Sequence, residues 1–336
     1  MLKNLSILIR TSGGLAPREQ LGFGHIYRST NLANQLRPNK IHFLVEDFGG
    51  ARKVIVSRGY RNVQSLKKRI SLESDIRETL KVIKDKKIDI LIIDRYKLKK
   101  QYVRQLSKFV KTVVISDLQL VDFSAHLVIN GFIGFANQIR FNRFGTKLVL
   151  GPRYQILNKN FEKVKNKKKI ITLLATFGGF DENNIVETLL ESAEQYLEHI
   201  KLRVILGPAT THSLKIVDFE KRYKNNLTVI QQTEFMHKEI ANAKYGVCAG
   251  GITSYEFAAL KVPFAIISQV EHQIITAREW ERENVAYNLG LIGKSTQRKI
   301  DVFLDKIITK TVKLKNTGII DGFGSKRAAR EILKLI

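Results

Sequence analysis

A histidine next to two glycines is the first residue in this sequence with a plausible chemical role. The segment Gly22–Arg28 reads GFGHIYR and lies between an apolar run that predicts a strand and a periodic run that predicts a helix. A glycine-rich strand-to-helix turn lets backbone N–H groups approach an anion, which the helix dipole also favours. A neutral imidazole in the first helical turn can take a proton from water. His25 is therefore a candidate general base, and the alternative is an incidental histidine in a helix-capping loop.

Two further glycine pairs follow apolar strands in the second half of the chain, Gly178-Gly179 and Gly250-Gly251. After the second pair, Thr253 could both cap a helix and bond a phosphate oxygen. Glu256 lies one helical turn further and could accept hydrogen bonds from two ribose hydroxyls. The alternative for Thr253 and Glu256 is a capping box that serves only the helix.

Other polar side chains also stand where predicted strands end. Asp94 and Tyr96 follow one strand and Asp117 follows the next, so all three should emerge at the carboxyl edge where α/β proteins bind ligands. His272 and Gln273 open a later helix and could bond a pyrophosphate or a sugar hydroxyl. Ordinary loop capping and a surface helix start are the respective alternatives.

Several familiar chemistries lack their sequence signatures here. The seven histidines are scattered without an H-E-x-x-H motif, so we expect no metal site. A P-loop and a G-x-S-x-G elbow are also missing, which argues against a P-loop nucleotidase and an esterase. The single cysteine, Cys248, is typical of a reducing compartment. The first apolar stretch is too short for a signal peptide, and no run approaches a membrane span, so we expect a soluble, cytoplasmic protein.

The chain is strongly basic, with 57 Lys and Arg against 31 Asp and Glu and a formal charge of +26. Such a field attracts polyanions and anionic membrane surfaces. The cations are spread along the chain, and no aromatic-interleaved platform for bases accompanies them. A solvated lysine-rich surface and weak membrane-surface association both fit this pattern, whereas specific nucleic-acid binding does not.

Strand-like and helix-like runs alternate in two successive series, which predicts two parallel sheets. We therefore expect Rossmann-like domains at 1–152 and 153–336, with residues 153–169 crossing between them and a last helix that could pack back on the first domain. The predicted strands are Leu5–Ile9, Ile41–Val45, Ile88–Ile93, Val113–Ile115, Leu127–Ile129, Ile170–Ala175, Val204–Leu206, Thr228–Ile230, Tyr245–Val247 and Phe264–Ile267. The predicted helices are Ile26–Leu36, Ser71–Lys84, Tyr102–Phe109, 183–197, 236–243, 253–260 and 272–282.

Taken together, these motifs resemble the UDP-sugar hydrolases of pseudaminic acid biosynthesis and the related spore-coat polysaccharide proteins. More remotely they resemble the GlcNAc transferase of peptidoglycan synthesis. The resemblance runs over nearly the whole chain, through the GFGHIYR segment, Asp94-Arg95-Tyr96, Gly151–Leu157, the two later glycine pairs and Asp321–Arg327.

The resemblance implies a GT-B fold, with two Rossmann-like doubly wound domains facing across a cleft, and metal-free hydrolysis of a UDP-activated diacetamido-trideoxy sugar. His25 matches the family's catalytic histidine and Tyr96 its sugar-side tyrosine, while His272 stands where the family usually has Asn. The resemblance implies a nucleotide and phosphate site at Gly250, Gly251, Thr253, Glu256 and Gln273, to which we add Gly178 and Gly179 because they follow a predicted strand. We place Gly22, Gly24, Arg28, Asp94 and His272 on the sugar side.

We thus expect a monomeric, cofactor-free hydrolase that binds a UDP-sugar and uses His25 to activate water. One alternative is a metal-independent glycosyltransferase, in which His25 would deprotonate an acceptor hydroxyl. The other is a nucleotide-sugar binding protein without catalysis.

Overall fold

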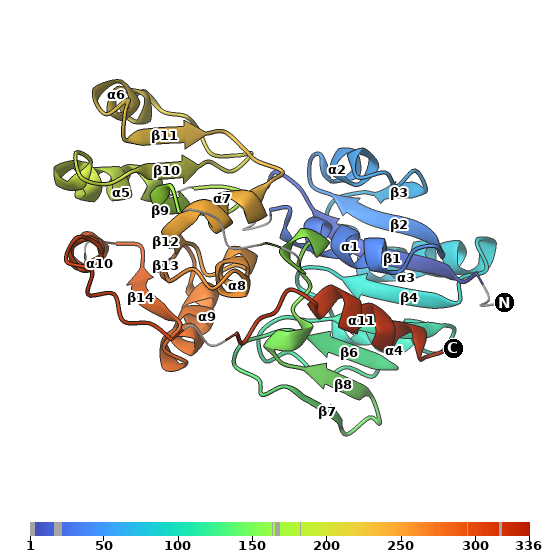
Figure 1. Ribbon diagram of the computed structural model, residues 1–336. Coiled ribbons are helices and arrows are strands. Elements are labelled where there is room, and N and C mark those ends of the chain that lie inside the picture. The colour runs from blue at the N-terminus through green and yellow to red at the C-terminus, as the bar shows by residue number, and fades with distance from the viewer. Residues whose placement is uncertain are drawn as a thin grey trace. The chain divides into compact units, whose positions relative to one another are not determined.

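The computed structural model describes residues 4–16, 22–162, 164, 169–181, 183–293, 295–315 and 318–336. The chain forms two compact units, and each is described by itself. The first takes in the chain up to Lys159 together with Gly322–Ile336, and the second takes in Asn160–Asp321 (Figure 1). The sequence placed the division at 152/153. Of the predicted crossing segment, residues 163 and 165–168 lie outside the described residues.

A mostly parallel sheet forms the centre of the first unit. Among the described residues it has eight strands in the order β3-β2-β1-β4-β5-β6-β8-β7, and β7 runs antiparallel to β8. The strands are β1 (Ser6–Gly13), β2 (Lys40–Asp47), β3 (Val63–Leu66), β4 (Ile90–Asp94), β5 (Lys111–Ile115), β6 (Leu127–Asn130), β7 (Gln138–Phe141) and β8 (Lys147–Leu150). The helices are α1 (Gly24–Gln35), α2 (Ala51–Ser57), α3 (Leu72–Asp85), α4 (Lys100–Leu106) and α11 (Gly324–Leu333).

The second unit repeats this arrangement with a fully parallel sheet. Within the described part of the chain its strand order is β11-β10-β9-β12-β13-β14. The strands are β9 (Ile171–Thr176), β10 (Leu202–Ile205), β11 (Leu227–Ile230), β12 (Ala243–Cys248), β13 (Phe264–Ser268) and β14 (Ala286–Leu291). The helices are α5 (Ile185–Ala193), α6 (Leu214–Arg222), α7 (Met236–Asn242), α8 (Ile252–Ala259), α9 (Glu271–Arg282) and α10 (Thr296–Ile308). The short 3-10 helices of the chain are η2 (Pro152–Tyr154), η3 (Lys159–Glu162) and η4 (Glu194–Tyr196).

Both orders are doubly wound, because the strand sequence reverses direction next to β1 and next to β9. The prediction of two Rossmann-like sheets is therefore confirmed. The sequence reading missed the short edge strands β3, β7 and β14, the strand β8, and the helices α2, α6 and α10.

Alternate residues of β1 face the two helical layers of the first unit, as a strand period of two requires. Ile7 and Ile9 pack with apolar residues of α1, α2 and α11. Leu8 packs on the opposite face with residues of α3 and α4. Arg10 therefore points to the α3 and α4 side, where its side chain is completely buried. The core of this face must accommodate a charge.

Helix α11 belongs to the first unit although it comes last in the chain. Ala328 and Ile332 join the same apolar cluster as α1. The Ser325 hydroxyl donates to the carbonyl of Leu157, and Lys147 Nζ pairs with Glu331 at 2.6 Å. A Cβ added to Gly324 would lie 2.0 Å from the backbone oxygen of Gln155, so only glycine lets the helix approach this closely.

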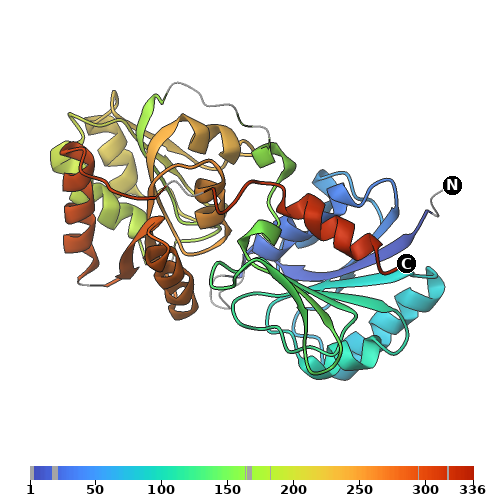
Figure 2. The same cartoon turned by 60° about the horizontal axis from the view of Figure 1, so that its bottom comes forward.

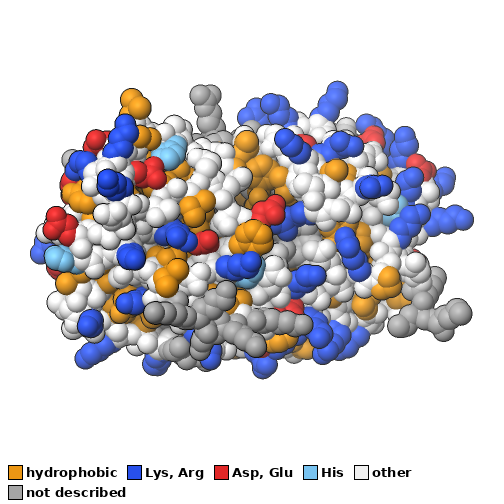
Figure 3. Space-filling view, turned by 45° about the horizontal axis from the view of Figure 1, so that its top comes forward, with side chains coloured by type: hydrophobic (Ala, Val, Ile, Leu, Met, Phe, Trp, Pro, Cys, Tyr) orange, Lys and Arg blue, Asp and Glu red, His pale blue; other side chains and the backbone are white. Residues whose placement is uncertain are grey.

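The surface agrees with the charge distribution expected from the sequence. On the face shown in Figure 3, Lys and Arg side chains are scattered among fewer acidic ones. Among the described residues, no helix is both long and apolar enough to cross a membrane.

The contact at Gly324 predicts the effect of a single methyl group. Gly324→Ala should lower the free energy of unfolding by about 1–3 kcal/mol, because the backbone of Gln155 cannot move aside without disturbing α11. Gly293→Ala is the matched control, since the closest atom to its new Cβ would be 4.0 Å away. Urea denaturation of both variants measures the difference, and equal stabilities would show that α11 tolerates the shift.

Candidate active site

His25 lies in the first turn of α1, as the sequence predicts. Phe23 is the N-cap, Gly24 is the first helical residue, and no side chain caps the helix. A Cβ added to Gly24 would meet no atom within 4 Å, so the space beside this turn is open. Gly22 precedes the turn and accepts a hydrogen bond from the amide of Gly14. Residues 17–21 of the preceding loop lie outside the described residues.

The imidazole of His25 is held by a buried carboxylate. Nδ1 of His25 lies 2.7 Å from Oδ1 of Asp94, which ends strand β4. The Asp94 side chain is 1% exposed, whereas that of His25 is 17% exposed. A carboxylate can only accept a hydrogen bond, so Nδ1 carries the proton. The lone pair of the neutral ring is then on Nε2.

Arg28 also approaches Nδ1, at 3.1 Å from Nη2. The two hydrogens of that Nη2 are already used, because it donates to Asp94 at 2.6 Å and to Asp117 at 2.9 Å. The arginine therefore does not compete for the histidine nitrogen. Arg28 and Asp94, predicted on the sugar side, are both buried here and pair with each other.

The charge of Asp94 is stabilised by its neighbours. Burial alone would raise the pKa of its carboxyl, but Arg28 and His25 outweigh burial and hold that pKa well below the usual range. The Ser29 hydroxyl donates a further hydrogen bond at 3.1 Å. The Asp117 side chain is 51% exposed, and Arg28 outweighs its partial desolvation and lowers the pKa of its carboxyl. Asp94 is therefore a carboxylate at neutral pH and accepts a hydrogen bond from Nδ1–H of His25.

The next residue, Arg95, is held by a second set of buried charges. Its guanidinium contacts Asp75 and Glu46, the latter at 2.9 Å. Arg10 donates to the same two carboxylates, at 2.7 Å to Asp75 and 3.2 Å to Glu46. Two guanidinium groups thus balance two carboxylates in the core. Ion pairs on both Asp94 and Arg95 fix the backbone from which the histidine's partner extends.

Tyr96 completes this loop. Its amide donates to the hydroxyl of Ser12 at 3.3 Å, and the ammonium of Lys97 lies 5.0 Å from the centre of its ring. The phenol hydroxyl bonds to none of the described residues, so it is available to a ligand. The structure places Tyr96 two residues from the histidine's carboxylate partner, without a direct contact to His25.

In the second unit, the glycine pair Gly250-Gly251 opens helix α8. Gly251 is the N-cap and no side chain caps this helix. The capping box offered as an alternative for Thr253 and Glu256 is therefore not formed. Neither side chain has a hydrogen-bond partner among the described residues. A Cβ on Gly251 would meet no atom of the described residues within 4 Å, so an anion can approach the amides at the start of this helix.

Glu256 sits in a desolvated position. Burial raises the pKa of its carboxyl to about 8. Burial, and then the charge of Glu256, also raise the pKa of the Cys248 thiol well above its usual value, so that thiol is not a nucleophile at neutral pH. A carboxyl group without a partner at the carboxyl end of β12 is suited to ligand hydroxyls.

Gln273 is brought against the same turn. A Cβ on Gly250 would lie 2.8 Å from the Cβ of Gln273, so this glycine allows the start of α9 to approach. The Gln273 Oε1 accepts from the amide of Gln269 at 2.9 Å, which leaves its NH2 group free of described partners. His272 is exposed on the first turn of α9. The sequence reading missed two buried oxygens nearby, on Ser268 and Gln269, which have no partner in the described structure.

Gly178 and Gly179 are placed differently from expectation. Helix α5 begins only at Ile185, and Asp181 caps it through the amides of Ile185 and Val186. Gly178 has a φ of +88°, which favours glycine. A Cβ on Gly207 would lie 2.0 Å from the Gly178 oxygen, so this glycine pair packs against a neighbouring loop. It does not open a helix as Gly250-Gly251 does.

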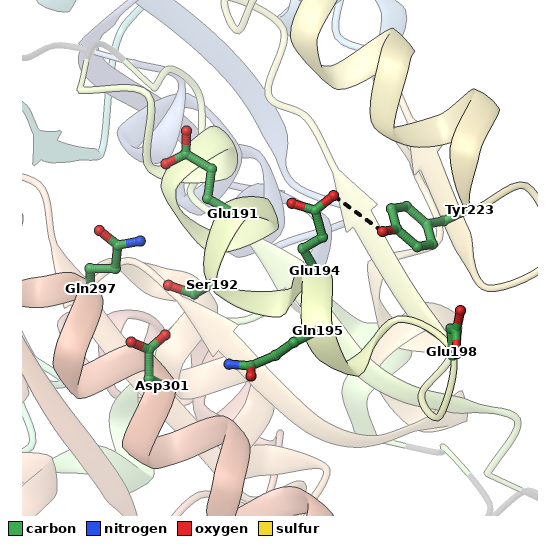
Figure 4. A pocket seen from close by; sticks show the side chains of 8 residues that line it. All are labelled: Glu191, Ser192, Glu194, Gln195, Glu198, Tyr223, Gln297 and Asp301. Atoms are coloured by element: carbon green, nitrogen blue, oxygen red, sulfur yellow. Dashed lines mark hydrogen bonds between the residues drawn. The ribbon is translucent and has the colours of Figure 1, made fainter.

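An open hollow of about 500 Å³ in the second unit contains none of the predicted residues. Its lining is Glu191, Ser192, Glu194, Gln195, Glu198, Tyr223, Gln297 and Asp301, with Glu194 bonded to Tyr223 (Figure 4). Four carboxylates make this hollow unsuitable for a phosphate group. Within the described residues, no group of three or more His, Cys, Asp and Glu side chains is arranged to hold a metal ion.

Comparison with known proteins supports the architecture. No family model matches the chain. The chain is 26% identical to the uncharacterized protein MJ1062 of Methanocaldococcus jannaschii over 286 aligned residues. This alignment covers 80% of this chain and 57% of that protein. It is 29% identical to the spore coat polysaccharide biosynthesis protein SpsG of Bacillus subtilis over 230 aligned residues. This alignment covers 63% of this chain and 65% of that protein. The matched region thus spans less than two thirds of either relative.

Solved structures share the whole fold at low sequence identity. MurG of Acinetobacter baumannii superimposes with a TM-score of 0.64 at 13% identity, covering 98% of this chain and 99% of MurG. UDP-GlcNAc 2-epimerase of Neisseria meningitidis, bound to UDP-GlcNAc, gives 0.62 at 12% identity, covering 98% and 100%. The chain therefore has a GT-B-type fold, and at these identities the likeness establishes the fold alone.

The partly buried carboxyl of Glu256 predicts a pH-dependent stability. A carboxyl with a raised folded-state pKa keeps its proton up to about pH 8, whereas the unfolded chain releases it near 4.5. The stabilisation from this group is complete below pH 4.5 and is lost as pH rises toward 8. Relative to wild type, Glu256→Gln should therefore gain roughly 1–3 kcal/mol of unfolding free energy between pH 5 and pH 8.

Chemical denaturation at a series of pH values measures this gain. Glu271→Gln, at an exposed position on α9, is the matched control and should show no such gain. A constant difference between Glu256→Gln and wild type across the range would mean that Glu256 is solvated in the folded protein.

Proposed function

We propose that this chain hydrolyses a UDP-activated amino sugar to UDP and the free sugar, with His25 as the general base. The observation that carries the proposal is the His25–Asp94 pair, in which a buried carboxylate accepts a hydrogen bond from Nδ1–H and leaves Nε2 as the basic atom. The open space beside Gly24 is on the same helical turn. This is the arrangement that general-base catalysis requires.

In the proposed reaction, Nε2 of His25 removes a proton from water while the water oxygen bonds to the anomeric carbon. The bond from that carbon to the β-phosphate oxygen breaks, and UDP leaves with the electron pair. Asp94 stabilises the imidazolium that forms, and Arg28 and Ser29 hold Asp94 in place.

The second unit supplies groups that fit the nucleotide. The amides at the start of α8 would receive the diphosphate, and Glu256 would accept bonds from the ribose hydroxyls. Thr253 and the free NH2 of Gln273 offer further donors. Likenesses to SpsG, named for spore coat polysaccharide biosynthesis, and to an epimerase holding UDP-GlcNAc favour a sugar nucleotide as the ligand.

A glycosyltransferase is the second candidate, because the same base could deprotonate an acceptor hydroxyl and because MurG shares the fold. Incubating the protein with a panel of UDP-sugars, with and without sugar acceptors, separates the two. UDP release without an acceptor supports hydrolysis. UDP release only when an acceptor is present would show a transferase. If no UDP-sugar of the panel released UDP under either condition, both candidates would be refuted.

Variants of the pair test the role of the base. His25→Asn should lower kcat about 10²–10⁴-fold and leave KM nearly unchanged, because a general base acts on the transition state. Asp94→Asn should lower kcat within the same range, since the amide no longer fixes the Nδ1–H form. Asp117→Asn, which touches Arg28 but not His25, is the comparison and should cost much less. An unchanged kcat in His25→Asn would mean that the base lies elsewhere.

Binding of UDP should also release a proton. Ribose hydroxyls stabilise the charged form of Glu256, so its pKa should fall from about 8 when UDP binds. Calorimetry in buffers of different ionisation enthalpy should show proton release near pH 7 and an affinity that rises with pH up to about 8. Glu256→Gln should bind UDP more weakly and release no proton. Equal proton release by the variant would assign it to another group.

A further inference from the structure

The edge of the first unit's sheet carries exposed apolar side chains that the proposed chemistry does not use. Phe141 on β7 is 68% exposed, and Phe144 in the turn to β8 and Ile139 on β7 are each 49% exposed. Phe109, just before β5, is 65% exposed. Figures 1 and 2 show the β7–β8 hairpin, in green, at the end of the sheet without a helix on its outer side.

These phenylalanines gather at one end of the strands. Phe141 pairs with Lys147, the first residue of β8, and Lys147 is level with Leu127, the first residue of β6. Leu127 is in turn level with Val113 near the start of β5. The rings of Phe109, Phe141 and Phe144 therefore lie along the amino edge of the sheet. Asp94 ends β4, so the His25 site is at the opposite, carboxyl edge.

Positive charge accompanies the rings. Asp117 and Asp122 are the only acidic residues between Lys97 and Lys159. Asp122 is already paired with Arg143 at 2.6 Å and with Lys100 at 3.3 Å, and Asp117 is bound to Arg28. Lys108, Lys111 and Arg140 are exposed and have no ion-pair partner among the described residues. This edge thus combines cations that have no ion-pair partner among the described residues with exposed apolar side chains.

We propose that the amino edge of the first unit, defined by Phe109, Phe141, Phe144 and Lys111 with Arg140 beside it, docks on an anionic lipid bilayer. Apolar side chains lose water contact when they enter the interfacial region, and cations beside them are attracted to acidic headgroups. Two copies meeting at this edge would bring the same cations together, which opposes self-association.

The docked orientation has a consequence for function. The strands run from the docking edge toward the carboxyl edge, so the side of the sheet that carries His25 and Asp94 points away from the lipid. A water-soluble sugar nucleotide could still reach it. Docking would place the enzyme at the membrane surface without covering the site, and loss of docking should leave turnover of a soluble substrate unchanged.

Co-sedimentation of the whole chain with vesicles tests the proposal. The protein should pellet with vesicles of equal parts phosphatidylcholine and phosphatidylglycerol and remain in solution with phosphatidylcholine alone. Phe141→Ser with Phe144→Ser should lower the partition coefficient about tenfold or more. Lys111→Gln with Arg140→Gln should lower it about fivefold for each charge. Leu214→Ser, which removes an exposed side chain of the second unit, is the matched control and should bind like wild type.

Circular dichroism and UDP release should be unchanged in all of these variants. Wild-type protein that ignores the anionic vesicles would overturn the proposal, as would a phenylalanine double variant that pellets like wild type. A wild-type oligomer that Phe141→Ser with Phe144→Ser dissociates would assign the edge to self-association instead.

Discussion

The carboxylate of Asp94 is the group on which the first unit's site depends. It accepts hydrogen bonds from His25, Arg28 and Ser29 while only 1% of its side chain is exposed. A charge this deeply buried persists only when its partners compensate for lost hydration. The same compensation sets the chemistry of the histidine, because both hydrogens on Nη2 of Arg28 are donated to carboxylates and Asp94 accepts the hydrogen bond from Nδ1–H. The basic nitrogen is thereby Nε2, the ring nitrogen that is not bonded to Asp94.

The neighbouring residue shows why this arrangement is rigid. Arg95 joins a core of two guanidinium groups and two carboxylates, in which Arg10 comes from β1, Glu46 from β2 and Asp75 from α3. Buried ion pairs add little net stability compared with apolar packing, but breaking one of them costs much more. The consecutive residues Asp94 and Arg95 are thus tied to three different elements, α1, β2 and α3. A loop held in this way cannot let the carboxylate drift from the imidazole.

Part of this could be predicted from the sequence, because it depends on local patterns. The two strand series, the helix start at His25 and the glycine pair before Glu256 all follow from residues close together in the chain. The pairing of Arg28 with Asp94 and Asp117 could not, because spacing does not show which distant carboxylates a side chain meets. Gly178 and Gly179 look locally like a phosphate-binding turn, yet they pack against Gly207. Arg10 gave one usable signal, a charge within an apolar strand. The edge strand β7 gave none, because all four of its residues are exposed.

The central claim is that Asp94 fixes the tautomer of His25, and ¹⁵N NMR of the labelled imidazole tests it most directly. The His25 resonances are assigned by their loss in His25→Gln. In the neutral ring, the account predicts a protonated Nδ1 whose proton is shifted downfield by the short bond to Asp94, and an unprotonated Nε2. In Asp94→Asn this preference should weaken or reverse. A wild-type spectrum with the proton on Nε2 would contradict the account, because the basic nitrogen would then be the one that faces the Asp94 carboxylate.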